Sequence, residues 1–215
     1  QARKQGANVR PTEKSTYDRA GEGPMLVVIS GPSGVGKDSV LRQLKELGRN
    51  WHFTVTATTR TQRLGEDDGV DYLFLDRDTF HQKAREGEFL ECAQVYGNWY
   101  GVPRDQVSDA LAKGLDVIIK ADVQGAATIK RVVPQAVFIF LMPPSPEELE
   151  RRLRDRKTET TPDLELRIRT AMDELYQLPL FDYVVVNDHL ETAASQIDAI
   201  VTAEKCRIPS RRVHL

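Results

Sequence analysis

A glycine-rich segment at residues 31–37, GPSGVGK, carries the groups best suited to hold a chain of phosphates. Its G-x-x-x-x-G-K spacing is typical of a phosphate-binding loop. Glycines let successive backbone N–H groups turn toward one anion, a following helix adds about half a positive charge, and Lys37 adds a full one. We therefore expect a nucleoside triphosphate to bind at Gly31, Ser33, Gly34, Val35, Gly36 and Lys37.

The two residues after the loop depart from the usual pattern. Asp38 stands where Ser or Thr usually contacts Mg²⁺, and Ser39 comes one residue later. An acid is favourable at a helix N-terminus, so capping is preferred for Asp38 over direct metal contact. Ser39 is then the hydroxyl expected to serve the phosphates or Mg²⁺, and both residues are assigned to the triphosphate site.

The loop needs a strand before it and a helix after it, and the sequence supplies both. The apolar run MLVVIS at 25–30 is typical of a buried parallel strand, and apolar residues recur at helical spacing over 37–47, before Gly48. Further apolar runs begin at 116, 136 and 183 and alternate with helical patterns. This alternation predicts an α/β fold, a three-layer phosphate-loop core with a parallel sheet.

Two later helices have clear start signals. Ser145 as N-cap, Pro146 at the first position and Glu148 at the third predict a helix that runs to about Arg154. A second helix is expected after Thr161-Pro162. Its apolar face is predicted to consist of Leu164, Ile168, Ala171, Leu175 and Leu178.

The pattern also divides the chain into parts. Short alternating stretches between the first helix and residue 116, such as HFTVTA at 52–57, indicate a small mixed α+β insert. Residues 1–24 are polar and typical of a flexible tail. We expect a domain at 25–207, with a core of 25–56, 110–153 and 169–207, an insert at 57–109, a lid at 154–168 and a C-terminal tail at 208–215.

Composition excludes several classes of protein. The 215 residues carry 30 Lys and Arg against 32 Asp and Glu, and this net charge of −2 disfavours a broad nucleic-acid-binding surface. The longest apolar run, 136–142, is far shorter than the ~20 residues of a membrane-spanning helix, so no membrane contact is expected. Two cysteines without Cys-x-x-Cys spacing favour a reducing compartment, taken as the cytoplasm.

Several segments in a fixed order, from about Met25 to Lys205, closely resemble guanylate kinase, a nucleoside monophosphate kinase of the phosphate-loop family. They are the loop, TATTRTQR at 56–63, GEDDGVDYLF at 65–74, EFLE at 88–91, YGNWYG at 96–101 and DVQG at 122–125. The resemblance implies transfer of the γ-phosphoryl group of MgATP to GMP, giving ADP and GDP. ATP, GMP and Mg²⁺ are therefore the expected ligands.

The resemblance assigns the phosphate of GMP to four donors. Two arginines three residues apart and two tyrosine hydroxyls form a multi-donor clamp for a dianion, with the fork geometry that lysine lacks. Solvated arginines and half-buried packing of the tyrosines are the alternatives. The residues implied are Arg60, Arg63, Tyr72 and Tyr100.

The base of GMP calls for a carboxylate. Guanine presents its N1–H and N2 amino groups side by side, so one carboxylate can accept both, whereas N1 of adenine is an acceptor that repels it. By resemblance this carboxylate is Glu91, Thr56 donates to guanine O6, and Asp122 lies near the acceptor and the metal, which it reaches through a water. An exposed acid in a turn is the alternative for Glu91.

The transfer itself needs alignment and cancellation of charge, because the attacking phosphate oxygen is already anionic. The resemblance places the lid arginines at Arg152, Arg156 and Arg167, and a contact to the adenine of ATP at Asn187. A surface ion pair with Glu148 is the alternative for Arg152.

Four positions depart from the family pattern. Val102 replaces a hydroxyl residue expected in the base pocket, and Lys120 replaces an acid two residues before Asp122. Lys157 stands where the lid often has glycine, and Cys92, where an aromatic residue is frequent, is interpreted as a packing residue.

Two other functions compete with this interpretation. A kinase for ribose 1,5-bisphosphate carries a similar Lys-Asp-Ser sequence, but Glu91, the arginine pair and Asp71-Tyr72 favour GMP. A non-catalytic guanylate-kinase-like interaction module usually lacks the loop lysine, which is intact here. Monomer and homodimer both fit the sequence.

Overall fold

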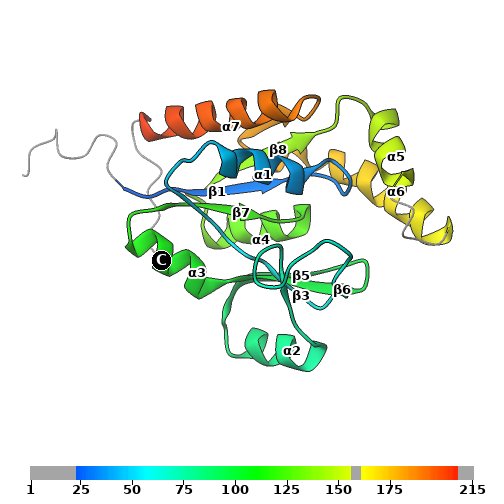
Figure 1. Ribbon diagram of the computed structural model, residues 1–215, viewed down its shortest axis with the longest axis horizontal. Coiled ribbons are helices and arrows are strands. Elements are labelled where there is room, and N and C mark those ends of the chain that lie inside the picture. Colours follow the sequence, from blue (N-terminus) through cyan, green and yellow to red (C-terminus); the bar gives the residue numbers. More distant parts are fainter. Residues whose placement is uncertain (1–22, 156–160, 208–215) are drawn as a thin grey trace, which may run out of the picture.

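The computed structural model describes residues 23–155 and 161–207, and within them a five-stranded parallel sheet forms the centre (Figure 1). The strand order is β2-β7-β1-β8-β9, so the strand that leads into the glycine loop, β1, lies in the middle. The bounds are β1 Leu26–Ser30, β2 Trp51–Phe53, β7 Asp116–Lys120, β8 Val137–Met142 and β9 Tyr183–Val186. The predicted α/β fold with a parallel sheet is confirmed.

Helices cover both faces of this sheet and give three layers (Figure 1). Alternate residues of β1 point to opposite faces: Val27 and Ile29 pack with the first pair of helices, and Leu26 and Val28 with the second. This two-sided burial explains why the strand is apolar throughout. The first pair is α1 (Lys37–Glu46) and α7 (Leu190–Lys205), and the second is α3 (Arg104–Ala112) and α4 (Val123–Val132).

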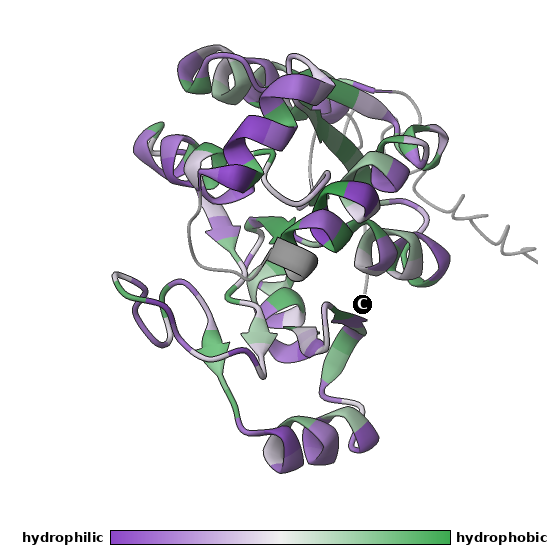
Figure 2. Cartoon of the chain, turned by 90° about the vertical axis from the view of Figure 1, so that its right-hand side faces the viewer, coloured by the Kyte–Doolittle hydropathy of each residue, from purple (hydrophilic) through white to green (hydrophobic). Residues whose placement is uncertain are grey.

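Hydropathy follows this layering. Figure 2 shows hydrophobic green concentrated in the strands of the main sheet, whereas the helices around it carry purple hydrophilic stretches. Within residues 23–155 and 161–207, none of the helices combines the length and apolar character needed to cross a bilayer.

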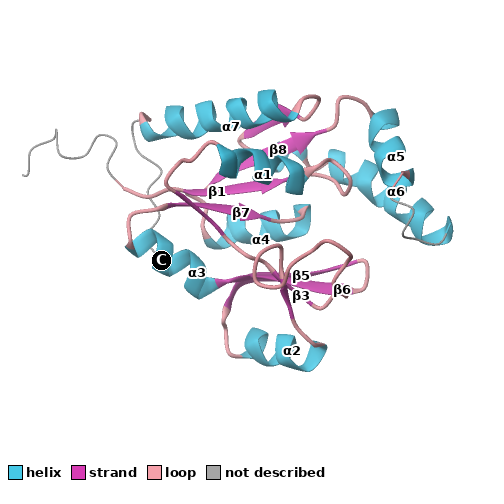
Figure 3. Ribbon diagram, in the orientation of Figure 1, coloured by secondary structure: helices cyan, strands magenta, loops and turns pink. Residues whose placement is uncertain are grey.

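A second, smaller sheet lies on one side of the main sheet (Figure 3). Its order is β4-β3-β6-β5, with β3 and β4 parallel and the other pairs antiparallel. Strand β2 pairs with β7, so the alternating stretch that starts at His52 begins in the main sheet. The elements of the insert are β3 Ala57–Thr58, β4 Leu73–Phe74, α2 Arg77–Arg85, β5 Phe89–Val95 and β6 Asn98–Pro103.

The small sheet and α2 enclose their own hydrophobic cluster. Phe80 is fully buried, and its ring stacks on Phe89 with centroids 4.6 Å apart. A Cβ atom at Gly101 would lie 2.9 Å from the Phe89 ring, so this strand position accepts only glycine without repacking. Cys92 packs against the same cluster, in agreement with the structural role expected for it.

Two further helices, α5 (Pro146–Arg154) and α6 (Thr161–Leu175), pack against each other beside the loop (Figure 1). The Ser145 hydroxyl accepts the backbone N–H of Glu148 at 3.2 Å, which confirms the predicted start of α5. Leu178 does not continue α6 as predicted; it begins the short 3₁₀ helix η2 (Leu178–Leu180), because Pro179 cannot extend an α-helix. Most of the two predicted tails (1–22 and 208–215) and residues 156–160 of the lid, with Arg156 and Lys157, lie outside the described residues.

The cluster of the insert supports a stability prediction. Phe80→Ala is expected to lower the free energy of unfolding by about 3 to 5 kcal/mol, because it removes a fully buried ring and leaves a cavity. Urea denaturation followed by the fluorescence of Trp99, which packs beside Phe80, measures the change. Leu64→Ala is the control, since Leu64 is fully exposed and its loss is expected to change stability by less than about 0.5 kcal/mol. Equal midpoints for the two variants would contradict the assigned packing.

Candidate active site

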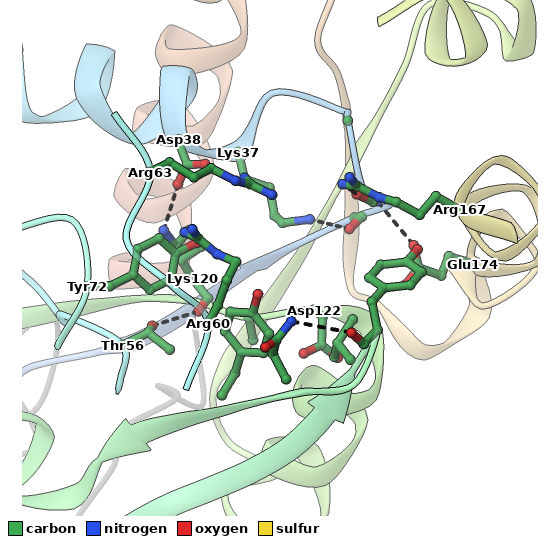
Figure 4. Close-up of a pocket in the computed structure, with 18 of the residues that line it drawn as sticks. Lys37, Asp38, Thr56, Arg60, Arg63, Tyr72, Lys120, Asp122, Arg167 and Glu174 are labelled. Carbon is green, nitrogen blue, oxygen red and sulfur yellow. Dashed lines mark hydrogen bonds and ion pairs between the residues drawn. The ribbon is translucent and has the colours of Figure 1, made fainter. Parts of the chain in front are cut away.

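A cavity of about 640 Å³ lies at the carboxyl end of the main sheet, between the glycine loop, the insert and α6 (Figure 4). Ligand sites in open α/β sheets lie at this edge, where strands end and helix N-termini begin. Most of the predicted site residues line it. They are Gly31, Ser33, Gly34, Gly36, Lys37, Asp38, Thr56, Arg60, Arg63, Tyr72, Glu91, Tyr100, Asp122 and Arg167.

The glycine loop is shaped by its backbone. Gly31, Gly34 and Gly36 have φ of 146°, 86° and 97°, a region that side chains with a Cβ rarely adopt. Space is limiting as well, because a Cβ at Gly31 would lie 2.3 Å from the carbonyl oxygen of Leu141. Gly36 is the N-cap of α1, so the loop delivers the chain directly into a helix N-terminus.

Lys37 bends back over the loop that precedes it. Its Nζ donates to the carbonyl oxygens of Gly31 at 2.5 Å and Pro32 at 3.2 Å. Burial lowers the pKa of Lys37, and the nearby carboxylates of Glu174 and Asp38 oppose that shift. The cation is therefore held inside the loop, where an anion can reach it.

Helix α6 holds Ser33 from two sides. The Ser33 backbone N–H donates to Glu174 Oε2 at 3.1 Å, and Arg167 Nη2 donates to Ser33 Oγ at 2.8 Å. Burial raises the pKa of Glu174, against the attraction of Lys37 and Arg167. A phosphate that binds the Ser33 N–H must displace this carboxylate. Sequence reasoning missed Glu174, although its spacing of two helical turns from Arg167 places both on one face of α6.

Tyr96, at the tip of the β5–β6 hairpin, joins the insert to α6. The guanidinium carbon of Arg167 lies 5.3 Å from the centroid of its ring. Tyr96 has φ of 48° in the two-residue turn Tyr96-Gly97, a conformation for which Asn or Gly is usual. Burial raises the pKa of Tyr96 to about 12. The sequence analysis gave this residue no role of its own.

Other predicted site residues support the back of the loop. Asn187 is buried, and its Nδ2 donates to the carbonyl oxygen of Val35 at 2.8 Å. Arg152 donates to the carbonyl oxygens of Val35 and Asn187, each at 3.3 Å, and also forms the 2.7 Å ion pair with Glu148. Ser39 is half-buried in the first turn of α1, and none of these side chains is among the described residues that line the cavity.

The predicted phosphate clamp is assembled on the insert side of the cavity. The Arg60 guanidinium carbon lies 5.2 Å from the centroid of the Tyr72 ring, and the rings of Tyr72 and Tyr100 have centroids 6.2 Å apart. Arg60 and Arg63 both extend toward the cavity from the loop between β3 and β4 (Figure 4). Their donors can converge on one anion.

Glu66, to which the sequence analysis gave no role, orients this clamp. Arg60 Nη2 donates to its two carboxylate oxygens at 2.8 and 3.0 Å, and the backbone N–H of Arg63 donates to Oε2 at 2.9 Å. Burial alone would raise the pKa of Glu66, but the hydrogen bonds and charges of Arg60 and Arg63 together outweigh burial and lower the pKa. The sequence did contain a signal for this contact, because Glu66 follows Arg63 by three residues and Arg60 by six.

Glu91 on β5 is a buried acid whose charged neighbour is another carboxylate, Asp122. It is 6% exposed, and its Oε2 finds no hydrogen-bond donor among the described residues. Burial, and then the charge of Asp122, raise the pKa of Glu91 to about 8. The carboxylate is also confined, because a Cβ at Gly125 would lie 2.9 Å from Oε1. A ligand with adjacent N–H groups would satisfy it.

The surroundings of Glu91 are partly as predicted. Asp122 is the N-cap of α4 and accepts the backbone N–H of Gly125 at 2.9 Å. The Thr56 hydroxyl, 3.4 Å from the carbonyl oxygen of Lys120, lines the same cavity. Val102, which replaces the hydroxyl residue expected in the base pocket, is paired with Glu91 across β5 and β6 and is wholly buried in the hydrophobic cluster on the α3 and α4 side of the main sheet.

Comparisons with known proteins agree with this geometry. The family model described as guanylate kinase matches residues 24–204. The chain is 46% identical over 195 residues to "Guanylate kinase 2, chloroplastic/mitochondrial" of Oryza sativa subsp. japonica, covering 89% of this chain and 68% of that protein. It is 44% identical to a guanylate kinase of Carboxydothermus hydrogenoformans, covering 85% and 90%. The crystal structure of guanylate kinase from Anaplasma phagocytophilum superimposes with a TM-score of 0.72 at 36% identity, covering 87% of this chain and 88% of that one.

The shifted acid supports a prediction about stability and pH. The pKa of Glu91 in the folded protein is about 8, above the ordinary value of 4.5. The contribution of the neutral carboxyl to the free energy of unfolding is therefore fully present below pH 4.5 and is lost as the pH rises through 8. Glu91→Gln is therefore expected to be more stable than the parent at pH 9, by roughly a few kcal/mol, and close to it at pH 5. Urea denaturation across this range measures the difference, and a difference that does not change with pH would show that the carboxyl titrates normally.

Proposed function

The chain belongs to the guanylate kinase family, and from this premise we propose how its cavity transfers the γ-phosphoryl group of ATP to GMP, giving ADP and GDP. The acceptor is bound on the insert side and the donor at the glycine loop, so that their phosphates meet over Lys37. The observation that carries the assignment of GMP is the Glu91 carboxyl, buried in the same cavity as the Arg60 clamp.

Glu91 supports a guanine acceptor for a chemical reason. The N1–H and N2 amino groups of guanine give two adjacent donors to one carboxylate, and Oε2 has no donor among the described residues. Adenine would set its N1 lone pair against the same carboxyl and leave it without both hydrogen bonds. Thr56 is the proposed donor to guanine O6, and Gly125 keeps Glu91 in place.

The clamp supports a phosphate on this acceptor. Arg60 is already oriented by Glu66 and by the face of Tyr72, so little side-chain entropy is lost when a dianion arrives. Arg63, Tyr72 and Tyr100 supply further donors. Because GMP carries its phosphate at the end opposite the base, one molecule reaches both Glu91 and the clamp.

The glycine loop is the proposed site for the phosphates of ATP. Backbone N–H groups from Ser33 to Ser39, the start of α1 and Lys37 provide the positive field. Asn187 and Arg152 act on this loop from behind, through the carbonyl oxygen of Val35. The contact of Asn187 with adenine stays a prediction from the sequence.

The transfer step requires alignment and charge cancellation, since a phosphate oxygen of GMP is anionic near neutral pH and needs no general base. Arg167, which donates to Ser33 Oγ and contacts the Tyr96 ring, is the residue proposed to contact the transferred group. Lys37 neutralises charge on the donor side. Arg156 and the rest of the lid keep the role expected from the sequence.

Mg²⁺ fits this site as a partner of the phosphates. Within the described chain, no group of three or more His, Cys, Asp or Glu could hold a metal by itself, and Mg²⁺ commonly keeps waters and binds through substrate phosphates. Ser39 and, through water, Asp122 are the residues proposed to hold it. When bound, it supplies charge neutralisation at the β- and γ-phosphates.

The alternatives have less support. The comparisons give no support for a sugar bisphosphate kinase. Ribose 1,5-bisphosphate also has no base that could pair with Glu91. A non-catalytic interaction module does not require the Lys37 ammonium inside the glycine loop, and here that ammonium is present. A cytoplasmic location, and assembly as a monomer or homodimer, stay predictions from the sequence.

A coupled assay of ADP formation tests the function. With MgATP as donor, GMP is expected to be the preferred acceptor, AMP to be at least roughly 100-fold worse in kcat/KM because it lacks the paired donors, and ribose 1,5-bisphosphate to be inactive. Turnover of the sugar phosphate alone would sink the assignment.

Glu91→Gln tests whether Glu91 distinguishes guanine from adenine. The amide can accept only one of the two guanine hydrogen bonds and turns a donor toward the other, so the preference for GMP over AMP is expected to narrow by roughly 10- to 100-fold. The ratio of the two kcat/KM values measures this, with KM for ATP as the internal control. An unaltered ratio would mean that other groups distinguish the bases.

A further inference from the structure

Lys120, the last residue of β7, places an ammonium group between the two halves of the cavity. Its Nζ lies 2.6 Å from Asp38 Oδ1 and 4.0 Å from the centroid of the Tyr72 ring (Figure 4). The side chain is 12% exposed and lines the cavity. It therefore touches one group from each side, since Asp38 follows the loop lysine and Tyr72 belongs to the clamp.

The pairing joins two unusual residues, since Asp38 departs from the general phosphate-loop pattern and Lys120 from the family pattern. Asp38 stands where a hydroxyl residue is usual, and Lys120 stands where an acid is usual. The two positions are 82 residues apart in the chain, yet their charged groups are in contact. A cation at position 120 thus takes the usual place of an acid, and an acid at position 38 lies in contact with it.

Stability alone gives a weak reason for this ion pair. The Asp38 side chain is 61% exposed, and an ion pair in which one of the two groups is exposed to water contributes little to the free energy of unfolding. Lys120, in contrast, has only 12% of its side chain exposed, which is costly for an ammonium unless its donors are used. Asp38 and Tyr72 each accept one of its three N–H donors, which leaves one donor for a group bound in the cavity. An anion in the cavity would use that donor.

We propose that Lys120 is a further catalytic residue, whose ammonium contacts the phosphate of the acceptor nucleotide, and that Asp38 is the positioning residue that holds it there. This inference rests on the proposed function, because the anion is the phosphate bound by Arg60, Arg63 and Tyr72. Lys120 then adds fixed positive charge where the acceptor phosphate faces the donor, and reduces the repulsion between the two substrates.

The charges around Lys120 favour this role. Burial would lower the pKa of Lys120, but Tyr72 and Asp38 outweigh it and raise the pKa, so the group stays a cation. Lys37 and Arg60 face the same cavity from the loop and from the insert. The acceptor phosphate is therefore expected to meet cations from three elements.

Binding of GMP and of guanosine to Lys120→Met separates a phosphate contact from a structural role. Titration calorimetry without ATP is expected to show GMP bound roughly 10-fold more weakly or worse, the loss of one charge-assisted hydrogen bond, with guanosine unchanged in competition. Lys113→Met, a change at an exposed lysine at the end of α3, is the control and should bind GMP like the parent. Equal losses for GMP and guanosine, or no loss for either, would overturn the proposal.

A phosphorus NMR titration of bound GMP provides the second measurement. A phosphate monoester has a second pKa of about 6, and a contacting ammonium lowers it. In Lys120→Met the bound phosphate should titrate at higher pH than in the parent, in Lys120→Arg it should recover, and in Asp38→Asn it should shift partway. An identical titration in parent and Lys120→Met would refute the contact. If the parent itself does not turn over GMP, the proposed function fails; if it does and the titrations coincide, this inference alone fails.

Discussion

Repulsion between two phosphate-bearing substrates is the constraint on which this structure depends. The chain has a net charge of −2, so the cations that offset this repulsion must be concentrated at one place. The parallel sheet does this by bringing the glycine loop, the end of β7 and the insert to one edge. Each cation there also has a protein carboxylate close by: Arg60 has Glu66, Lys120 has Asp38, and Arg167 and Lys37 have Glu174.

Glu91 differs from these paired groups, because it is an acid whose charged neighbour is another acid, Asp122. It is also highly buried and has an elevated pKa. Such a group costs stability, and proteins retain costly buried groups where a ligand uses them. The cavity thus combines a cationic half, proposed to bind phosphates, with one carboxyl on β5 that is proposed to select the base.

The parts that sequence could predict are those with local signals. Glycines in a loop of fixed spacing, apolar runs buried on both faces and the Ser145 cap each act within a few residues, and they gave the loop, the main sheet and α5 correctly. Tyr96 and Glu174 act through partners on other elements, which only the fold brings together, and Glu66 acts through a loop whose conformation the sequence does not define.

The grip of α6 on Ser33 has a consequence for how products leave. The Ser33 N–H and the nearby cations have Glu174 as an internal anion, carried on a helix packed beside the loop. When a nucleotide leaves, the Glu174 carboxylate can take the place of its phosphates, so the Ser33 N–H, Lys37 and Arg167 are not left without an anion. Release then becomes an exchange of one anion, the phosphate, for another, the Glu174 carboxylate that already accepts the Ser33 N–H in this structure.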